Sequence, residues 1–262
     1  ANFAILVPSV ARLFRPEELA TINSIMLAGE CMTQTDLSSW APHVRLINGY
    51  GPAECSALSV VQPSISTTSD PRNIGYPVGC VLWVVDRNDH NKLVPQGAVG
   101  ELLIEGPIVG RGYINQPERT AEAFIEPPGW LQALRPPQTN CPRLYKTGDL
   151  VRFTSDGSLL VLGRKDRQVK VRGQRLELAE VEVHVHRSFD GAARDVVTQI
   201  IVPAGSTKAQ LVAMILLQEQ NGQGDKPKDH ESQILGAPSD TFAAQMAAAE
   251  IRLRQQVPDF MV

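Results

Sequence analysis

The sequence has 262 residues, of which 43% are apolar and 20% are charged, and its formal net charge is −3. An apolar fraction near the globular average excludes a wholly disordered chain, and the weak acidity argues against a general nucleic-acid coat. The apolar runs are far shorter than the roughly 20 residues of a transmembrane helix. We therefore expect neither nucleic acid nor a membrane as a partner, and one large domain or two modest ones.

The cysteines and the first residue bear on the protein's cellular setting. Cys31, Cys55, Cys80 and Cys141 are scattered without a C-x-x-C pair. This pattern fits neither a zinc site nor a small disulfide scaffold and favours the reducing cytoplasm. Ala1 begins an apolar segment with no basic leader ahead of it, which is unlike a signal peptide. We expect a cytoplasmic protein and a chain that is a piece of a longer one.

Strand-like segments dominate the first 165 residues. Arg15-Pro16-Glu17-Glu18 predicts the start of a helix, because proline suits the first turn and acids suit the positive end of the helix dipole. A second short helix is predicted at Pro117–Phe124 for the same reason. Four segments rich in branched apolar residues and ending near turn residues predict strands: Ser24–Leu27, Val44–Ile47, Val81–Asp86 and Glu101–Glu105.

The last hundred residues mix extended and helical patterns. Asp156-Gly157 predicts a tight turn, and apolar residues at four-residue spacing predict a helix at Leu178–Phe189. Residues 218–240 are polar and predict a mobile loop. The other expected elements are extended Leu159–Arg172, strands Val196–Val202 and Leu211–Leu217, and helix Ala243–Gln255. Together these patterns predict an α/β (mixed α+β) protein with subdomains 1–165 and 166–262.

A glycine-rich turn follows one of the predicted strands. The segment Asn48-Gly49-Tyr50-Gly51-Pro52-Ala53-Glu54 comes directly after Val44–Ile47, so backbone amides, an aromatic ring and a carboxylate share one strand end. Such strand ends are where open α/β sheets bind ligands. A plain structural turn is the alternative.

Two further segments place glycine beside charge. Residues 100–106 and 110–113, GELLIEG and GRGY, do not fit a phosphate-binding glycine motif, and we interpret them as a scaffold strand with tight turns. Residues 145–150, YKTGDL, place Asp149 where a carboxylate could accept hydrogen bonds from two ribose hydroxyls. The alternative for Asp149 is an aspartate that caps its own turn.

The most basic segment is Gly163–Arg175, with six basic residues among thirteen. Nucleic-acid binding is the obvious alternative, but the segment contains no aromatic residue to stack on bases. A solvated, twisted hairpin is the simplest structural interpretation.

Taken together, these four segments resemble the adenylation domain of nonribosomal peptide synthetases, in the adenylate-forming (AMP-binding) superfamily. The motifs that carry the resemblance are NGYGPAE, GELLIEGPIVGRGYI, YKTGDL and GRKDRQVKVRGQRLELAEVE. The last motif is the most specific for peptide synthetases. The resemblance covers residues 1 to about 215 and resumes near Val257, and it implies parts of a large N-terminal and a small C-terminal subdomain.

The resemblance implies an ATP-dependent ligase that joins an amino or aryl acid to AMP and releases pyrophosphate. By similarity, Tyr50 stacks on adenine and Asn48 contacts its edge. Glu54 is the expected catalytic Mg²⁺ ligand, since carboxylates suit this hard cation. Asp149 and Arg164 are the expected ribose ligands. The remaining nucleotide-site positions implied by the resemblance are Gly29, Gly51 and Ala53.

The resemblance also implies a substrate pocket that lacks charged residues. Because an ionic side chain would find no partner there, an apolar or aromatic acid is favoured. That these are ordinary core residues remains the alternative. The pocket positions carried over are Ile5, Met26, Ala28, Gly49, Ala57 and Leu58.

A second half-reaction is implied for the C-terminal part. Asp166 matches the hinge about which the small subdomain rotates, and Lys170 is the expected catalytic residue after rotation. The partners implied are a peptidyl carrier domain, whose phosphopantetheine accepts the acyl group, and a condensation domain of the same synthetase.

This sequence departs from the family pattern in several places. Ala53 stands where the family usually has threonine, and neither the family's phosphate loop nor its C-terminal catalytic lysine lies within the 262 residues. We therefore expect weak nucleotide binding and no appreciable turnover from the isolated chain. An acyl-CoA synthetase-like ligase and a non-catalytic binding or scaffold fragment are the alternatives.

Overall fold

A computed structural model describes residues 2–135, 143–171, 174–203, 210–218 and 240–257. The chain divides into two units, Ala1–Asp166 and Arg167–Val262. This boundary lies beside the position near residue 166 that the sequence indicates. Their assignment as the two subdomains of an adenylation domain stays a prediction.

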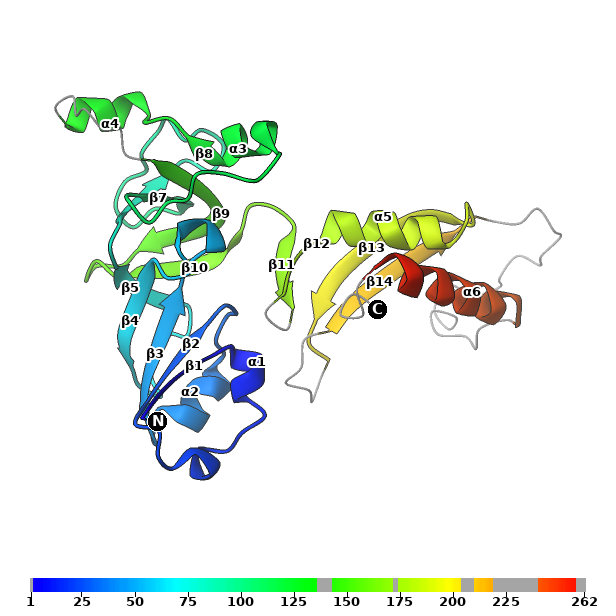
Figure 1. The fold of residues 1–262 in the computed structure, drawn as a ribbon, viewed down its shortest axis with the longest axis horizontal. Coiled ribbons are helices and arrows are strands. Elements are labelled where there is room, and N and C mark those ends of the chain that lie inside the picture. The colour runs from blue at the N-terminus through cyan, green and yellow to red at the C-terminus, as the bar shows by residue number, and fades with distance from the viewer. Residues whose placement is uncertain (1, 136–142, 172–173, 204–209, 219–239, 258–262) are drawn as a thin grey trace, which may run out of the picture. The chain divides into compact units, whose positions relative to one another are not determined.

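A ten-stranded sheet organises the first unit (Figure 1). The strand order is β1-β2-β3-β4-β5-β10-β9-β7-β6, and β8 pairs with β9. β1, β2 and β3 are parallel, and every other pair in the sheet is antiparallel. The strands are β1 Phe3–Leu6, β2 Ser24–Ala28, β3 Arg45–Tyr50, β4 Val60–Ile65, β5 Asn73–Pro77, β6 Val81–Val85, β7 Gly100–Glu105, β8 Phe124–Ile125, β9 Leu144–Phe153 and β10 Leu159–Arg164.

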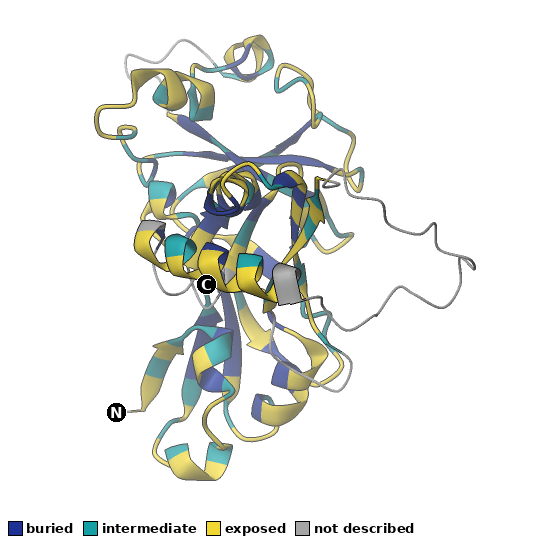
Figure 2. Ribbon diagram, turned by 90° about the vertical axis from the view of Figure 1, so that its right-hand side faces the viewer, coloured by how far each residue is buried: buried dark blue, intermediate teal, exposed yellow. Residues whose placement is uncertain are grey.

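Short helices accompany this sheet. The Thr33 hydroxyl caps α2 by accepting a hydrogen bond from the Asp36 amide at 3.3 Å, and the Asp36 carboxylate accepts one from the Thr33 amide at 2.7 Å. The helix then buries Leu37 and Trp40 in the core around β2 and β3. By contrast, α3 and α4 remain largely exposed (Figure 2). The helices are α1 Pro8–Ala11, α2 Gln34–Trp40, α3 Pro117–Ala123 and α4 Gly129–Leu134.

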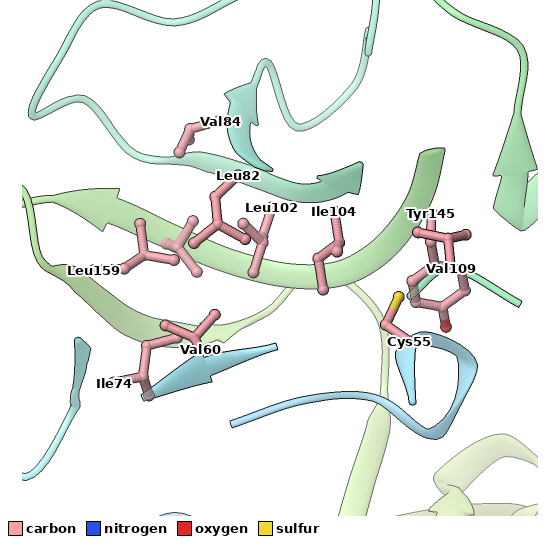
Figure 3. Close-up of a cluster of buried hydrophobic side chains, with 11 residues drawn as sticks. Cys55, Val60, Ile74, Leu82, Val84, Leu102, Ile104, Val109, Tyr145 and Leu159 are labelled. Carbon is pink, nitrogen blue, oxygen red and sulfur yellow. The ribbon is translucent and has the colours of Figure 1, made fainter. Parts of the chain in front are cut away.

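The central core of the first unit forms where the antiparallel strands pack. Leu82, Leu102, Ile104 and Leu159 lie in one row of apolar side chains, and Tyr145 joins them at one end (Figure 3). Leu102, Ile104 and Leu159 have no exposed surface. Because this cluster joins β6, β7, β9 and β10, it packs together the strands that carry the charged motifs.

The second unit has its own core. The hairpin of β11 (Gln168–Val171) and β12 (Gln174–Glu177) leads into helix α5 (Leu178–Ser188). The antiparallel pair β13 (Ala193–Ile201) and β14 (Gln210–Leu217) and the helix α6 (Asp240–Gln256) complete the unit. Buried side chains of β12, α5, β13 and α6 form one apolar cluster. Among the helices described here, none combines the length and the apolarity needed to cross a membrane.

Several expected elements differ from those observed. The helix predicted near Pro16 is only a 3₁₀ helix, Pro16–Leu19. The extended segment Leu159–Arg172 is broken after Arg164, where the chain passes between units. The segment YKTGDL lies inside β9 and not in a turn. Gly148 adopts a φ of +74°, and the pairing of β9 with β7 shifts register beside it, so the strand continues past this glycine. The polar loop predicted for 218–240 lies almost entirely outside the described residues.

Candidate functional site

The predicted substrate-pocket residues lie mainly at the C-terminal ends of the parallel strands. Ile5 of β1 pairs with Met26 of β2, and Ala28 of β2 pairs with Gly49 of β3. A Cβ atom on Gly49 would lie 2.9 Å from the Met26 sulfur and 3.1 Å from Leu58 Cδ1. Met26 and Leu58 therefore pack directly against the backbone of Gly49, and a side chain at this position would require one of them to move.

The turn after β3 folds tightly back on itself. A Cβ atom on Gly51 would lie 2.7 Å from the Ala57 carbonyl oxygen, so only glycine fits there without movement. Ser56 and Ala57 have φ angles of 56° and 63°, in the left-handed region that non-glycine residues rarely adopt. Residues held in such sparsely populated backbone conformations cluster at functional sites, which makes this turn a candidate for one.

Tyr50, Asp149 and Arg164 are brought together from three strands. The Tyr50 hydroxyl donates a hydrogen bond to Asp149 Oδ2, although 99 residues separate them in the chain. Arg164 donates through Nη1 to Asp149 Oδ1 at 2.9 Å. It also donates through Nε and Nη2 to the two carboxylate oxygens of Asp166, each at 2.6 Å. An aromatic ring, two carboxylates and a guanidinium therefore share one small region of the first unit.

Tyr50 and Arg164 keep one protonation state each at neutral pH. Burial and the neighbouring Asp149 carboxylate raise the pKa of Tyr50 well above its ordinary value of 10.0. Burial lowers the pKa of Arg164, but the carboxylates of Asp166 and Asp149 outweigh it and the net pKa lies above the ordinary value of 12.5. Tyr50 thus stays a hydrogen-bond donor and Arg164 a cation, while the Asp149 side chain has the oxygen atoms to accept hydrogen bonds from hydroxyl groups.

Glu54 lies just beyond the turn, at the start of a short 3₁₀ helix, Ala53–Cys55. Its Oε1 accepts a hydrogen bond from the Tyr113 hydroxyl at 2.7 Å, and its carbonyl accepts one from the Gly110 amide at 2.7 Å. In the ranges described here no three histidine, cysteine, aspartate or glutamate residues cluster as a metal site. One carboxylate suits Mg²⁺, which commonly takes its other ligands from water and substrate phosphates.

The other nucleotide-site positions differ in their surroundings. Asn48 is buried, and its amide nitrogen donates to the Asn73 carbonyl at 3.0 Å, so its Oδ1 atom is the better candidate to accept from an adenine amino group. Gly29 follows β2 with a φ of +89°, and Ala53 is exposed. None of these contacts tests a role in nucleotide binding, so the roles of Asn48, Gly29 and Ala53 stay predictions.

Lys170 belongs to the second unit. It lies on β11, is exposed, and pairs in register with Arg175 of β12. Asp166 is the final residue of the first unit. The predicted roles of both residues concern a rearrangement and stay predictions.

One sequence interpretation missed a contact with this site. The sequence of GRGY at 110–113 predicts only a scaffold, yet Gly110 and Tyr113 both donate hydrogen bonds to Glu54. Arg119 lies over the Tyr113 ring, 4.7 Å from its centroid. A tyrosine directly after a glycine-rich turn is the sequence feature that marks this segment as a possible part of the site. Tyr113 lies 59 residues from Glu54 in the chain, however, and the sequence pattern does not reveal their contact.

Comparison with known proteins gives a match to one family model and similarity to segments of much longer proteins. Residues 1–114 match the family model described as AMP-binding enzyme. The whole chain is 61% identical to part of the nonribosomal peptide synthetase fmqA of Aspergillus fumigatus. It is also 48% identical to part of the D-lysergyl-peptide-synthetase subunit 1 of Epichloe festucae var. lolii. The chain spans only 6% and 7% of these two relatives, respectively.

Solved structures confirm the adenylate-forming fold. The chain matches over its full length a fused adenylation and PCP di-domain from Klebsiella oxytoca, with a TM-score of 0.71, 21% identity and 44% of that chain covered. It also matches the Vibrio cholerae adenylation domain AlmE, in complex with glycyl-adenosine-5′-phosphate, with a TM-score of 0.66 and 26% identity. That match covers 84% of this chain and 42% of the other. The resemblance to adenylation domains of peptide synthetases, predicted from four motifs, is therefore confirmed.

Proposed function

Because the chain is similar throughout to a segment of nonribosomal peptide synthetases, we propose that it is part of an adenylation domain, an AMP-forming ligase. In its parent protein this domain activates an amino or aryl acid with ATP and releases pyrophosphate. The observation that carries the proposal is the cluster of Tyr50, Asp149 and Arg164. It joins an aromatic surface for a base to a carboxylate and a cation for a ribose.

ATP is the proposed nucleotide, held by groups with distinct tasks. The Tyr50 ring stacks on adenine, the Asn48 Oδ1 atom accepts from its edge, and Asp149 accepts from the ribose hydroxyls with Arg164 beside it. Gly29, Gly51 and Ala53 let the backbone approach the nucleotide.

Glu54 is the proposed Mg²⁺ ligand and is oriented by Tyr113 through their 2.7 Å hydrogen bond. The ion, when bound, neutralises charge on the phosphoryl oxygens. The protein's own contribution is to hold the acid and the nucleotide in line, which converts an encounter of two molecules into a reaction within one complex.

An apolar or aromatic acid is the proposed substrate class. The side chains of Met26 and Leu58, which pack against Gly49, present methylene, methyl and thioether groups, and the other proposed pocket positions, Ile5, Ala28 and Ala57, are also uncharged. A charged side chain would lose its hydration there without gaining a partner.

Transfer of the acyl group to phosphopantetheine on a peptidyl carrier domain is the proposed second step, in a synthetase that also contains a condensation domain. Asp166 serves as the hinge, because it is the last residue of the first unit. Lys170, exposed on β11, acts in this step.

Acid-dependent ATP–pyrophosphate exchange by the synthetase containing this chain tests the proposal. We expect exchange with apolar or aromatic acids, and a loss of about 100-fold or more in Asp149→Asn and Glu54→Gln, since each removes a charge that the reaction needs. Asp89→Asn is the control, because the Asp89 carboxylate makes exposed contacts, an ion pair with Lys92 and hydrogen bonds from Asn91. Absence of exchange with every acid, or transfer to free coenzyme A in preference to a carrier domain, would contradict the proposal.

A further inference from the structure

A buried carboxylate lies behind the proposed ribose-binding residues. Glu101 of β7 is 1% exposed, and the next three residues of its strand, Leu102, Leu103 and Ile104, have no exposed surface. Its Oε2 atom accepts from Lys165 Nζ at 2.5 Å, and its Oε1 atom accepts from the Gly148 amide at 3.1 Å. An ionised group in such a core costs stability unless its partners are well placed, so its presence calls for a reason other than packing.

The two partners of Glu101 flank the two charged residues of the nucleotide site. Gly148 directly precedes Asp149, and Lys165 directly follows Arg164. The Lys165 amide also donates to the Gly148 carbonyl at 2.9 Å, where β9 and β10 meet. One carboxylate therefore holds both strand segments from which Asp149 and Arg164 project.

The space at this junction is closely filled. A Cβ atom on Gly148 would lie 2.6 Å from Arg164 Nη2 and 2.9 Å from Asp166 Oδ2. The strand pairing is irregular on both sides, since the register of β9 shifts against β7 and against β10. Beyond the shift in β10, Asp149 and Arg164 are direct cross-strand partners, and the contacts of Glu101 with Gly148 and Lys165 lie beside this pair.

We propose that Glu101, paired with Lys165, is a positioning residue that sets the spacing of Asp149 and Arg164 for two adjacent ribose hydroxyls. This inference rests on the proposed function, because it assumes that Asp149 and Arg164 bind ribose. Glu101 acts only through Gly148 and Lys165 and touches no nucleotide. Its removal should therefore weaken the recognition of ribose hydroxyls more than the affinity for the rest of the nucleotide.

The test compares binding of AMP and 2′,3′-dideoxy-AMP to the full chain by titration calorimetry. The dissociation constant of 2′,3′-dideoxy-AMP divided by that of AMP measures recognition of the ribose hydroxyls, and a larger ratio means stronger recognition. We expect Glu101→Gln to reduce this ratio by roughly tenfold, the effect of one charge-assisted hydrogen bond. The amide retains an acceptor for Gly148 but loses the ion pair with Lys165. A purely structural role would lower the melting temperature while leaving the ratio of the folded protein unchanged.

A second pair of variants covers the case in which Glu101→Gln does not fold. Lys165→Met breaks the same ion pair from its partly exposed side, since the Lys165 side chain is 28% exposed, and it should reduce the ratio similarly. Lys165→Arg keeps the positive charge and should recover most of that loss. Lys92→Met, which breaks an exposed ion pair with Asp89, is the matched control and should bind both nucleotides as the parent chain does.

The possible failures can be told apart. If the parent chain does not prefer AMP, or if Asp149→Asn keeps the full preference, the ribose site itself is wrong, and the proposed function and this inference both fall. If Asp149→Asn abolishes the preference while Glu101→Gln and Lys165→Met retain it, the proposed function stands and the role of Glu101 is overturned.

Discussion

At the scale of single residues, the turn after β3 depends on the absence of a side chain at Gly51. A methyl group there would lie 2.7 Å from the Ala57 carbonyl oxygen and 2.8 Å from the Leu58 nitrogen. We expect Gly51→Ala to lower the free energy of unfolding by about 1–3 kcal/mol, the usual effect of overpacking. Urea unfolding followed by tryptophan fluorescence measures this, because Trp40, Trp83 and Trp130 all lie in the first unit.

Gly129→Ala is the matched control for this substitution. No atom lies within 4 Å of a Cβ placed on Gly129, which is the first residue of α4. The same exchange there should leave the unfolding free energy unchanged or raise it by up to about 1 kcal/mol, because alanine restricts the unfolded chain. Equal losses in both variants would show that close approach at Gly51 is not the cause.

Residue identities at the site were predictable from the motifs, but their contacts were not. Tyr50, Asp149 and Arg164 stand out because each lies beside a glycine, although only Tyr50 and Arg164 lie at strand ends and Asp149 lies inside β9. Spacing in the sequence does not disclose that Tyr50 and Asp149 share a hydrogen bond across 99 residues. Glu101 gave no signal, because a glutamate at the start of an apolar strand is ordinarily exposed.

At the scale of secondary-structure elements, helix α2 is held by an ion pair that depends on pH. Burial raises the pKa of Asp36, but its hydrogen bonds from Arg12 and Thr33 outweigh burial and hold the pKa below 3.8. The pKa of Asp36 is lower in the folded than in the unfolded protein. The ion pair therefore contributes fully to stability above about pH 3.8, and this contribution is lost as the pH falls through the folded pKa. We expect the tryptophan-monitored urea midpoint to fall steeply below pH 4.

Asp36→Asn should make that decline shallower, and it should also lower the midpoint at pH 7, because it removes the bidentate pair with Arg12. Glu250→Gln in α6 is the control, since it breaks an exposed pair with Arg254 in the other unit. An unchanged pH profile in Asp36→Asn would mean that other carboxylates set the acid limit.

Elements with a clear apolar pattern were predicted close to their observed bounds, and the irregular ones were not. The predictions at Val81–Asp86 and Leu178–Phe189 agree with β6 and α5 to within one residue. The strand β9 was missed because Thr147, Gly148 and Asp149 interrupt its apolar pattern. Tertiary pairing with β7 and β10 overrides that local signal.

At the scale of the whole molecule, the two units carry separate apolar cores. Val181 on α5 is 4% exposed in the core of the second unit. We expect Val181→Ala to lower the stability of that unit by about 1–3 kcal/mol, the cost of a small cavity. Circular dichroism at 222 nm should detect this loss, while the tryptophan transition of the first unit should keep its midpoint.

Val183→Ala provides the control, since Val183 lies on the same helix and is 46% exposed. Its effect should stay within about 0.5 kcal/mol. A shift of the tryptophan midpoint in Val181→Ala would show that the two cores unfold as one cooperative unit.

The position of β9 has a consequence for how the first unit opens. This strand pairs with β7, β8 and β10, and it carries Asp149 between two of those partners. Amide protons in such a strand exchange with solvent mainly through global unfolding, because no local fluctuation frees the strand from its neighbours. A nucleotide held at Asp149 should therefore slow hydrogen exchange in β7, β9 and β10 together and by a common factor, set by its concentration relative to its dissociation constant.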